Sequence, residues 1–221
     1  MDNYPAMRSI KGFIFDLDGT LLDTLEDLAA AVNKVLLGYG YAAKTRDEVR
    51  LLVGEGLRRL LVKVTGLEGE NPRLEAMILK FMEDYGACLI ATTRPYPGIE
   101  RLLGYLNRKR IPVAVFSNKA HEFTIRLMAH FFPEISFCQV RGKMEDMPAK
   151  PDPAGVLRIL EAMRLPAAEV AFVGDTRVDM ETAGNSGTFP IGVSWGFRSA
   201  AELREHGARI VLNHPGELEG F

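Results

Sequence analysis

The sequence predicts an α/β protein whose core is a doubly wound parallel sheet, and three observations support this fold class. Short runs that are apolar on both faces recur along the chain, as in parallel sheets covered on both sides. Segments with helical spacing separate these runs. A block of helical patterns without any strand pattern follows the first run, so we expect an all-helical domain inserted into the core.

Strands and helices alternate in the expected core. Strong strand patterns are GFIFD ending at Asp16, IPVAVFSN ending near Asn118, EVAFVGD ending at Asp175 and FPIGVSWG beginning at Phe189. Weaker strand patterns are ISFCQV at residues 135–140 and ARIVL at residues 208–212. Helices are expected at residues 98–109, 120–131, 152–164 and 177–187. Alternation at this spacing predicts a Rossmann-like core.

The insertion begins after the first strand and is helical throughout. Apolar residues recur at helical spacing along TLEDLAAAVNKVLLGYG, the first of its segments. Helical patterns cover residues 24–40, 45–53, 56–66 and 71–93. The sequence RPYPG, with two prolines and a glycine, marks the return to the core. We therefore expect a core of residues 1–23 and 93–221 and a helical cap of residues 24–92.

Composition excludes several classes of protein. The 221 residues carry a net charge of −2, so there is no basic field to hold a nucleic acid, and no apolar run is long enough to span a membrane. Two cysteines cannot form a disulfide framework, which favours a reducing, cytoplasmic setting. We expect a monomer or homodimer that acts on a small molecule.

Chemically unusual residues lie where the expected strands end. They are Asp16, Asp18 and Thr20 after the first strand, Ser117, Asn118 and Lys119 at the second, Gly174, Asp175 and Asp179 at a later one, and Lys150 just before a helix. Ligands of open parallel sheets bind outside the carboxyl ends of the strands. The sheet is therefore expected to gather these distant residues at one edge.

Four motifs in this order carry a resemblance to a known family. DLDGT at the first strand, Ser-Asn at the end of the second, Lys-Pro in AKPDP and GDTRVDM resemble the motifs of the haloacid dehalogenase superfamily of phosphatases. The resemblance covers nearly the whole chain. The helical insertion and the sequence PYPGIERLL also resemble the phosphoglycolate phosphatase group. The family implies an α/β core with a cap and a phosphatase activity.

The resemblance implies an Mg²⁺-dependent reaction through an aspartyl-phosphate. A phosphate monoester is dianionic, so a carboxylate attacks it only after the charge around it is neutralised. Mg²⁺ prefers oxygen ligands, and Asp16 and Asp175 fit that preference. By resemblance, Asp16 is also the nucleophile, the backbone carbonyl of Asp18 is a further metal ligand, and Asp179 holds a metal-bound water.

The remaining motif residues have roles in proton transfer and substrate binding. The resemblance implies that the side chain of Asp18 protonates the leaving alkoxide and later deprotonates the attacking water, and that Thr20 positions Asp18 by a hydrogen bond. Ser117 is expected to hold phosphoryl oxygens, and Lys150 to add a positive charge matched to phosphate. Asn118 is grouped with the substrate-binding residues without a catalytic role.

One loop of the insertion is a candidate for substrate selection. Gly54, Glu55 and Gly56 precede a helical pattern, and a glycine-flanked polar residue can approach a ligand closely. Related capped phosphatases use such a loop to select the leaving group, with Arg50 and Arg58 as possible counter-charges for an acidic substrate. The alternative is an ordinary helix start with surface charges.

Phosphoglycolate is the first substrate that the resemblance suggests. Pyrophosphate, nucleotides and sugar phosphates remain alternatives, as does a phosphosugar mutase, although mutases usually carry Val or Ile where Thr20 stands. Dehalogenases of the family lack the second aspartate, so Asp18 argues against them. A non-catalytic module that binds a phosphorylated metabolite would show damaged motif carboxylates, and none is damaged here.

Overall fold

A parallel sheet forms the centre of the molecule. The computed structural model describes residues 9–145 and 147–220. Within these residues, a six-stranded sheet has the order β5-β4-β1-β6-β7-β8, with every neighbouring pair parallel. Its strands are β1 (Gly12–Phe15), β4 (Val113–Ala120), β5 (Gln139–Lys143), β6 (Val170–Gly174), β7 (Phe189–Val193) and β8 (Ile210–Leu212). The predicted fold class, a doubly wound α/β core, is confirmed.

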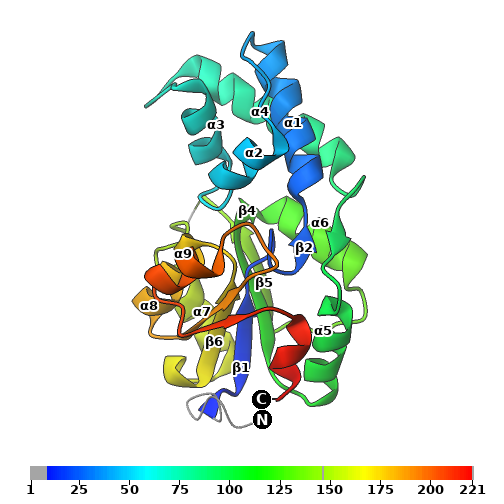
Figure 1. Cartoon of the computed structure of the whole chain (residues 1–221), viewed down its shortest axis with the longest axis vertical. Helices are drawn as coiled ribbons and strands as arrows, with labels where there is room; N and C mark the ends of the chain where they lie inside the picture. The colour runs from blue at the N-terminus through cyan, green and yellow to red at the C-terminus, as the bar shows by residue number, and fades with distance from the viewer. Residues whose placement is uncertain (1–8, 146, 221) are drawn as a thin grey trace.

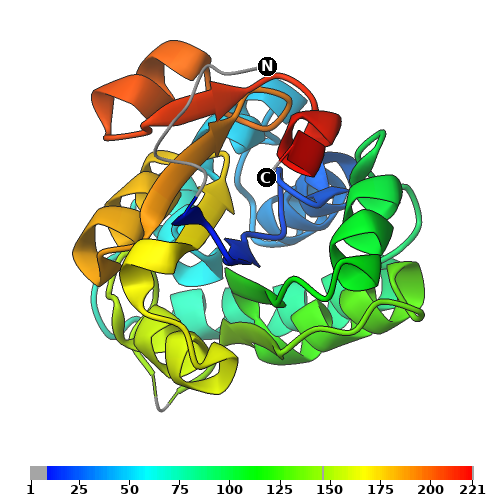
Figure 2. The same ribbon diagram turned by 90° about the horizontal axis from the view of Figure 1, so that it is seen from below.

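Helices cover both faces of the sheet, as the doubly apolar strands require (Figure 2). Successive side chains of β1 point to opposite faces, so Phe13 and Phe15 join one buried cluster and Ile14 another. Leucines of α5 and α6 belong to the first cluster, and α7 and α8 supply the second. The core helices are α5 (Ile99–Arg108), α6 (His121–Phe131), α7 (Ala154–Met163), η2 (Ala167–Glu169), α8 (Arg177–Ser186), α9 (Ala200–Glu205) and η3 (Pro215–Gly220).

A helical bundle lies at one end of the sheet, above the carboxyl ends of the strands (Figure 1). Local sequence explains where several of its helices begin. Thr45 and Glu48 form a reciprocal capping box, and Asn71 caps a helix that starts with Pro72. The helices are α1 (Leu25–Gly38), α2 (Arg46–Leu52), α3 (Leu57–Thr65) and α4 (Pro72–Cys88). We call this region the helical end.

The chain enters and leaves the helical end through a short ribbon. β2 (Leu22–Asp23) pairs antiparallel with β3 (Arg94–Pro95). Just above the ribbon, the Asp27 carboxylate accepts bonds from the amide and hydroxyl groups of Thr92 and Thr93, at 2.7–3.0 Å. Burial alone would raise the pKa of Asp27, but these bonds outweigh it and lower the pKa. The two connections are therefore tied to each other.

Two of the expected elements have clearly different bounds in the structure. The weak strand expected at residues 135–140 is observed at Gln139–Lys143, because the backbone of Ser136 pairs with the side chain of Asn107 instead of with β4. Helix α4 ends at Cys88 rather than near residue 93, because Thr92 and Thr93 turn toward Asp27. The pairing of β2 with β3 was not anticipated from the sequence.

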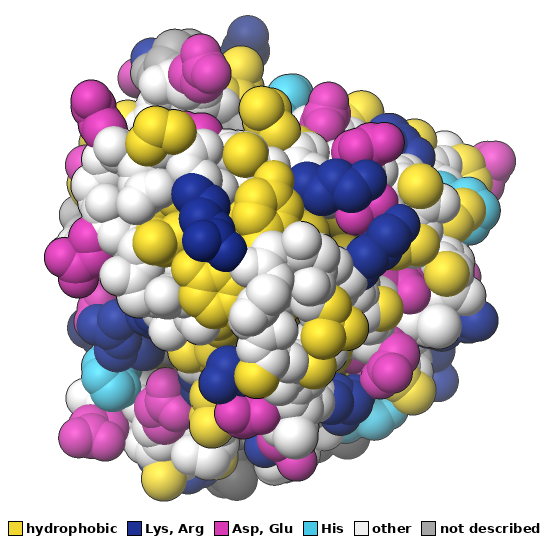
Figure 3. All heavy atoms as spheres, turned by 90° about the horizontal axis from the view of Figure 1, so that it is seen from above, with side chains coloured by type: hydrophobic (Ala, Val, Ile, Leu, Met, Phe, Trp, Pro, Cys, Tyr) yellow, Lys and Arg dark blue, Asp and Glu magenta, His cyan; other side chains and the backbone are white. Residues whose placement is uncertain are grey.

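The surface of the helical end carries charges of both signs. Viewed from above, Lys and Arg side chains lie around a hydrophobic area, with Asp and Glu side chains mainly toward the rim (Figure 3). Among the described residues, no helix has both the length and the apolar character needed to cross a bilayer.

Candidate active site

The polar motif residues meet at the carboxyl ends of three neighbouring strands. β1 lies between β4 and β6, so Asp16 is flanked by Ser117 in β4 and by Asp175 after β6. The chain order reverses at this point, because β4 and β5 extend to one side of β1 and β6, β7 and β8 to the other. Such a reversal is where ligands bind in open α/β sheets.

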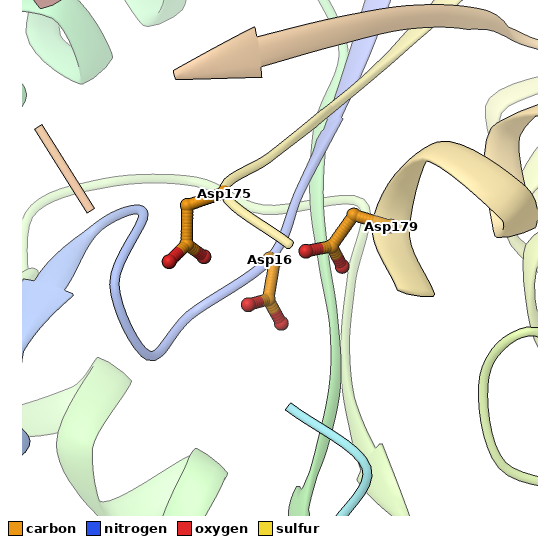
Figure 4. Close-up of side chains that lie close together, drawn as sticks. All are labelled: Asp16, Asp175 and Asp179. Atoms are coloured by element: carbon orange, nitrogen blue, oxygen red, sulfur yellow. The ribbon is translucent and has the colours of Figure 1, made fainter. Parts of the chain in front are cut away.

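Three carboxylates form a compact group in this crevice. Asp16, Asp175 and Asp179 each offer an oxygen, and the three oxygens lie within 4.8 Å of one another. Figure 4 shows the three side chains directed toward a common space from the end of β1, the end of β6 and the start of α8. All three residues are buried. We call this group the acidic cluster.

Burial and mutual repulsion disfavour ionisation of the acidic cluster. Burial raises the pKa of Asp16 to about 7, with Lys150 opposing the shift and Asp179 adding to it. The pKa of Asp175 is raised well above its usual value by burial and then by the nearby Asp179 and Asp16. A bound cation would reverse this preference, because it favours the ionised carboxylates.

The acidic cluster fits a hard divalent cation. Mg²⁺ is bound by one or two carboxylates and completes its octahedron with other oxygens. The three oxygens within 4.8 Å of one another are of this chemical type, and in the part of the chain that the structure describes three buried carboxylates face a single buried ammonium. The residues present therefore match the cofactor that the sequence predicts.

Lys150 is the ammonium at the acidic cluster. Its Nζ lies 2.6 Å from an oxygen of Asp16 and 2.6 Å from an oxygen of Asp179. Burial alone would lower the pKa of Lys150, but the two carboxylates outweigh it and raise the pKa. Asn118 holds the lysine in place, because its side-chain amide accepts a bond from the Lys150 N–H and donates one to the Lys150 carbonyl. Asn118 is thus a support for Lys150.

Asp175 is fixed by two donors. The Phe197 amide donates to one of its oxygens at 2.7 Å and the Thr20 hydroxyl to the other at 3.1 Å. The expectation that Thr20 positions Asp18 is therefore wrong, because its hydroxyl contacts a different carboxylate. Gly19 has φ +87°, and any Cβ there would collide with the Asp175 carboxylate, so this turn requires glycine.

Asp18 belongs to a separate ion pair. Both of its oxygens contact Lys119 Nζ, at 2.9 and 3.1 Å, and the Thr24 hydroxyl donates to one of them at 2.8 Å. Lys119 Nζ also donates to the hydroxyl of Tyr85 at 2.8 Å. Tyr85 comes from α4 and is buried. The second carboxylate of DLDGT is therefore held by residues from both the core and the helical end.

A cavity of about 70 Å³ lies between these residues and the helical end. We call this cavity the inner cavity. Its wall on the core side includes Asp16, Asp18, Ser117 and Lys119. Its wall on the helical side is formed largely by apolar side chains of α1, α3 and α4. A larger open groove of about 860 Å³ shares Leu57 and Met82 with it and carries charged residues of both signs. We call this the outer groove.

The glycine-flanked loop does reach the core, but its glutamate does not face the inner cavity. Gly54 and Gly56 line the inner cavity, and the carbonyl of Gly54 accepts a bond from Asn118 at 3.1 Å. Glu55 lines the outer groove instead and pairs with Lys63 at 2.8 Å and Arg177 at 3.3 Å.

The two arginines expected as counter-charges are also paired away from the inner cavity. Arg58 contacts Glu75 at 2.6 Å, and Arg50 contacts Asp47 at 3.5 Å. Neither arginine lines the inner cavity.

Several contacts at the site have little or no signal in the sequence. The hydroxyl of Tyr85 lies within an apolar helical stripe, so no pattern separates it from core residues. Phe197 contributes only a backbone amide, which no residue type encodes. Lys119 was expected at this edge of the sheet but its contact with Asp18 was not, and Thr24 had only its position near DLDGT as a signal.

Comparison with known proteins identifies related sequences. Residues 13–193 match the family model described as haloacid dehalogenase-like hydrolase. The chain is 32% identical over 205 residues to a phosphoglycolate phosphatase of Pseudomonas fluorescens, covering 90% of this chain and 75% of that protein. It is 28% identical over 215 residues to an N-acetylmuramic acid 6-phosphate phosphatase of Pseudomonas aeruginosa, covering 95% and 93%.

Solved structures share the fold. A haloacid dehalogenase-like family hydrolase from Streptococcus pneumoniae superposes with a TM-score of 0.86 at 22% identity, covering 96% of this chain and 98% of that one. At this level of identity the likeness concerns the fold.

Proposed function

The chain belongs to the haloacid dehalogenase-like hydrolases, and from this premise we propose that it is a Mg²⁺-dependent phosphatase that cleaves phosphomonoesters through an aspartyl-phosphate on Asp16. The observation that carries the proposal is the division of the DLDGT carboxylates. Asp16 lies in the acidic cluster and pairs with Lys150. Asp18 pairs instead with Lys119, at the wall of the inner cavity. This division supports Asp16 as the group that attacks phosphorus and Asp18 as the group that transfers the proton.

In the first half-reaction, an oxygen of Asp16 attacks phosphorus and the ester P–O bond breaks. Asp18 gives a proton to the leaving alkoxide, which departs as the alcohol. In the second half-reaction, Asp18 takes a proton from a water that attacks the phosphoryl group on Asp16. Inorganic phosphate is released and the Asp16 carboxylate is regenerated, so that the net change is hydrolysis of one ester.

The surrounding residues neutralise and hold the phosphoryl group. Lys150 uses two donors on Asp16 and Asp179, which leaves its third N–H for a phosphoryl oxygen. Ser117 lines the inner cavity next to Asp16 and is placed to donate its hydroxyl. Asp16, Asp175 and Asp179, with the backbone carbonyl of Asp18, would hold Mg²⁺, which when bound offsets the negative charge on the phosphoryl oxygens.

Residues 24–92 act in this proposal as a cap on a core of residues 1–23 and 93–221. Two contacts support the assignment: Tyr85 of α4 touches Lys119, and the carbonyl of Gly54 touches Asn118. Both join the helical end to the residues around the acidic cluster. A cap in this position excludes bulk water, which would otherwise screen the charges.

The substrate in this proposal is a small phosphorylated metabolite. The names of the relatives offer phosphoglycolate and N-acetylmuramic acid 6-phosphate as two compounds to compare. The first has a carboxylate next to the ester carbon, whereas the second has a sugar there.

The test is hydrolysis of p-nitrophenyl phosphate by the whole chain. We expect Mg²⁺-dependent activity that EDTA removes, and a loss of at least about 1,000-fold in Asp16→Asn. The control is Asp47→Asn, the same change at a side chain that is 78% exposed on α2. Acid-quenched wild-type protein should yield a phosphorylated peptide containing Asp16. Full activity of Asp16→Asn would falsify the assignment of the nucleophile.

A further inference from the structure

The inner cavity has an apolar wall opposite the reacting carboxylates. Side chains from α1, α3 and α4 of the helical end and from α6 of the core form it: Leu28, Leu57, Leu60, Phe81, Met82 and Phe123. Leu28, Leu60, Phe81 and Phe123 are each less than 9% exposed. In an ester whose phosphorus faces Asp16 for attack, the leaving group would lie against these side chains.

The charges on this wall are already paired. Among the described residues that line the inner cavity, the charged ones are Asp16, Asp18 and Lys119. Lys119 Nζ contacts both oxygens of Asp18 and the hydroxyl of Tyr85, which uses its three N–H donors. No described cation of the cavity wall is therefore free to receive a second anion.

Basic residues of α3 do not supply the missing charge. Lys63 is held by Glu55, and Arg58 is held by Glu75. Arg58 and Arg59 line the outer groove and not the inner cavity. An anion placed near the ester oxygen would thus be buried beside Asp18 without a cationic side chain to pair with, which is unfavourable.

We propose that the inner cavity selects phosphate monoesters whose leaving group is uncharged and apolar at the carbons next to the ester oxygen, and disfavours leaving groups with a carboxylate there, such as phosphoglycolate. The inference rests on the proposed phosphatase function and specifies its substrate class. Apolar carbons gain by contact with Phe81 and Leu60, whereas a carboxylate loses its hydration without gaining a cation. Groups farther from the ester oxygen can extend past Leu57 and Met82 into the outer groove.

The first experiment compares two substrates of similar size. Propyl phosphate and phosphoglycolate are hydrolysed by the whole chain with Mg²⁺, and kcat/KM is measured for each, with p-nitrophenyl phosphate as a reference. We expect propyl phosphate to be favoured by at least about tenfold. A phosphoglycolate value equal to or above that of propyl phosphate overturns the substrate class while p-nitrophenyl phosphate hydrolysis still supports the phosphatase. Hydrolysis of none of the three compounds overturns both proposals.

The second experiment places a cation on the apolar wall. Met82 is half-buried and lines both cavities, so the ammonium of Met82→Lys can be accommodated there. We expect Met82→Lys to raise kcat/KM for phosphoglycolate relative to propyl phosphate by about tenfold, which is the size expected for one added ion pair. Met82→Gln, which has similar length and no charge, should change this ratio much less than Met82→Lys does.

Two further lysine variants, one outside both cavities and one on the α3 side of the wall, test whether the position of the added charge matters. Leu79→Lys adds the same charge to α4 at a residue that is 72% exposed and outside both cavities, so the ratio should stay at the wild-type value. Leu57→Lys tests the wall from α3 if Met82→Lys does not fold. An unchanged ratio in the folded lysine variants, or an equal change in Leu79→Lys, contradicts the inference.

Discussion

Two carboxylates of one motif, Asp16 and Asp18, belong to regions of the molecule that are built differently. Asp16 shares the acidic cluster and Lys150, all of which come from the sheet core. Asp18 is held by Lys119 from β4, which in turn contacts Tyr85 from the helical end. In the proposed mechanism, the phosphoryl side of the site is therefore drawn from the core, whereas the proton-transfer side includes a contact with the helical end.

Lys150→Met tests the core region and has the largest expected effect. The substitution leaves three buried carboxylates without the ammonium that touches two of them. We expect kcat/KM to fall by about 100- to 1,000-fold, as when one donor to a developing negative charge is removed. In the metal-free protein, the free energy of unfolding should fall by about 3–5 kcal/mol.

Its control is Lys109→Met, at an exposed lysine at the end of α5. The free energy of unfolding of both variants is measured by chemical denaturation, once in EDTA and once in Mg²⁺. Mg²⁺ should recover part of the stability lost in Lys150→Met, because it supplies positive charge to the same carboxylates. Wild-type activity of Lys150→Met would contradict the role proposed for Lys150 in neutralising charge at the acidic cluster.

The pH dependence of the metal-free protein tests the same region without mutation. The pKa of Asp16 is raised to about 7, and that of Asp175 is also raised, so the folded protein holds protons that the unfolded chain releases near pH 4. These bound protons contribute to the free energy of unfolding below about pH 4. The contribution, on the order of a few kcal/mol, is lost as pH rises toward 7.

Denaturation in EDTA at several pH values between 5 and 8 measures this loss. Mg²⁺ should abolish it, because the cation favours the ionised carboxylates. Asp175→Asn, which removes one raised carboxyl group, should flatten the profile, whereas Asp152→Asn, at an exposed residue before α7, should not. Stability that increases with pH across this range in EDTA would contradict the electrostatic account of the acidic cluster.

Lys119→Met tests the proton-transfer region and has a smaller expected effect. Asp18 would keep only the Thr24 hydroxyl among its described donors, so its orientation would loosen. We expect kcat/KM for an alkyl phosphate to fall by about ten- to 100-fold, and by less for p-nitrophenyl phosphate, whose leaving group needs no proton. The Mg²⁺ concentration for half-maximal activity should not change. An equal loss with both substrates would assign Lys119 a role other than positioning Asp18.

The same division explains what could be predicted from the sequence. The strands of the core are apolar on both faces, and parallel strands end at one edge, so the meeting of Asp16 and Asp175 follows from local patterns and topology. The fold class was predicted on the same basis. The weak strand was placed too early because the pairing of Asn107 with Ser136 joins residues far apart in the chain.

The contacts around Asp18 could not be read from the sequence. They depend on how the helical end sits on the core, and periodicity within a helix does not determine that arrangement. Thr20 and Thr24 are both threonines near Asp18 in the chain, yet the fold directs Thr20 to Asp175 and Thr24 to Asp18. Glu55 was expected near the substrate, but its pairs with Lys63 and Arg177 hold it at the outer groove.

Tyr85→Phe separates the contribution of the helical end from that of Lys119 and has the smallest expected effect. It removes one hydroxyl that accepts from Lys119 Nζ and leaves the ring in its packing against Phe81 and Phe123. Loss of one such bond corresponds to about two- to tenfold in kcat/KM. The loss should be greater for alkyl phosphates than for p-nitrophenyl phosphate, because the hydroxyl acts through Lys119 on Asp18. Tyr105→Phe, beside Lys109 on α5, is the matched control and should leave both rates unchanged. If Tyr85→Phe also leaves both rates unchanged while Lys119→Met does not, Asp18 is positioned by the core alone, and the contrast between the two regions disappears.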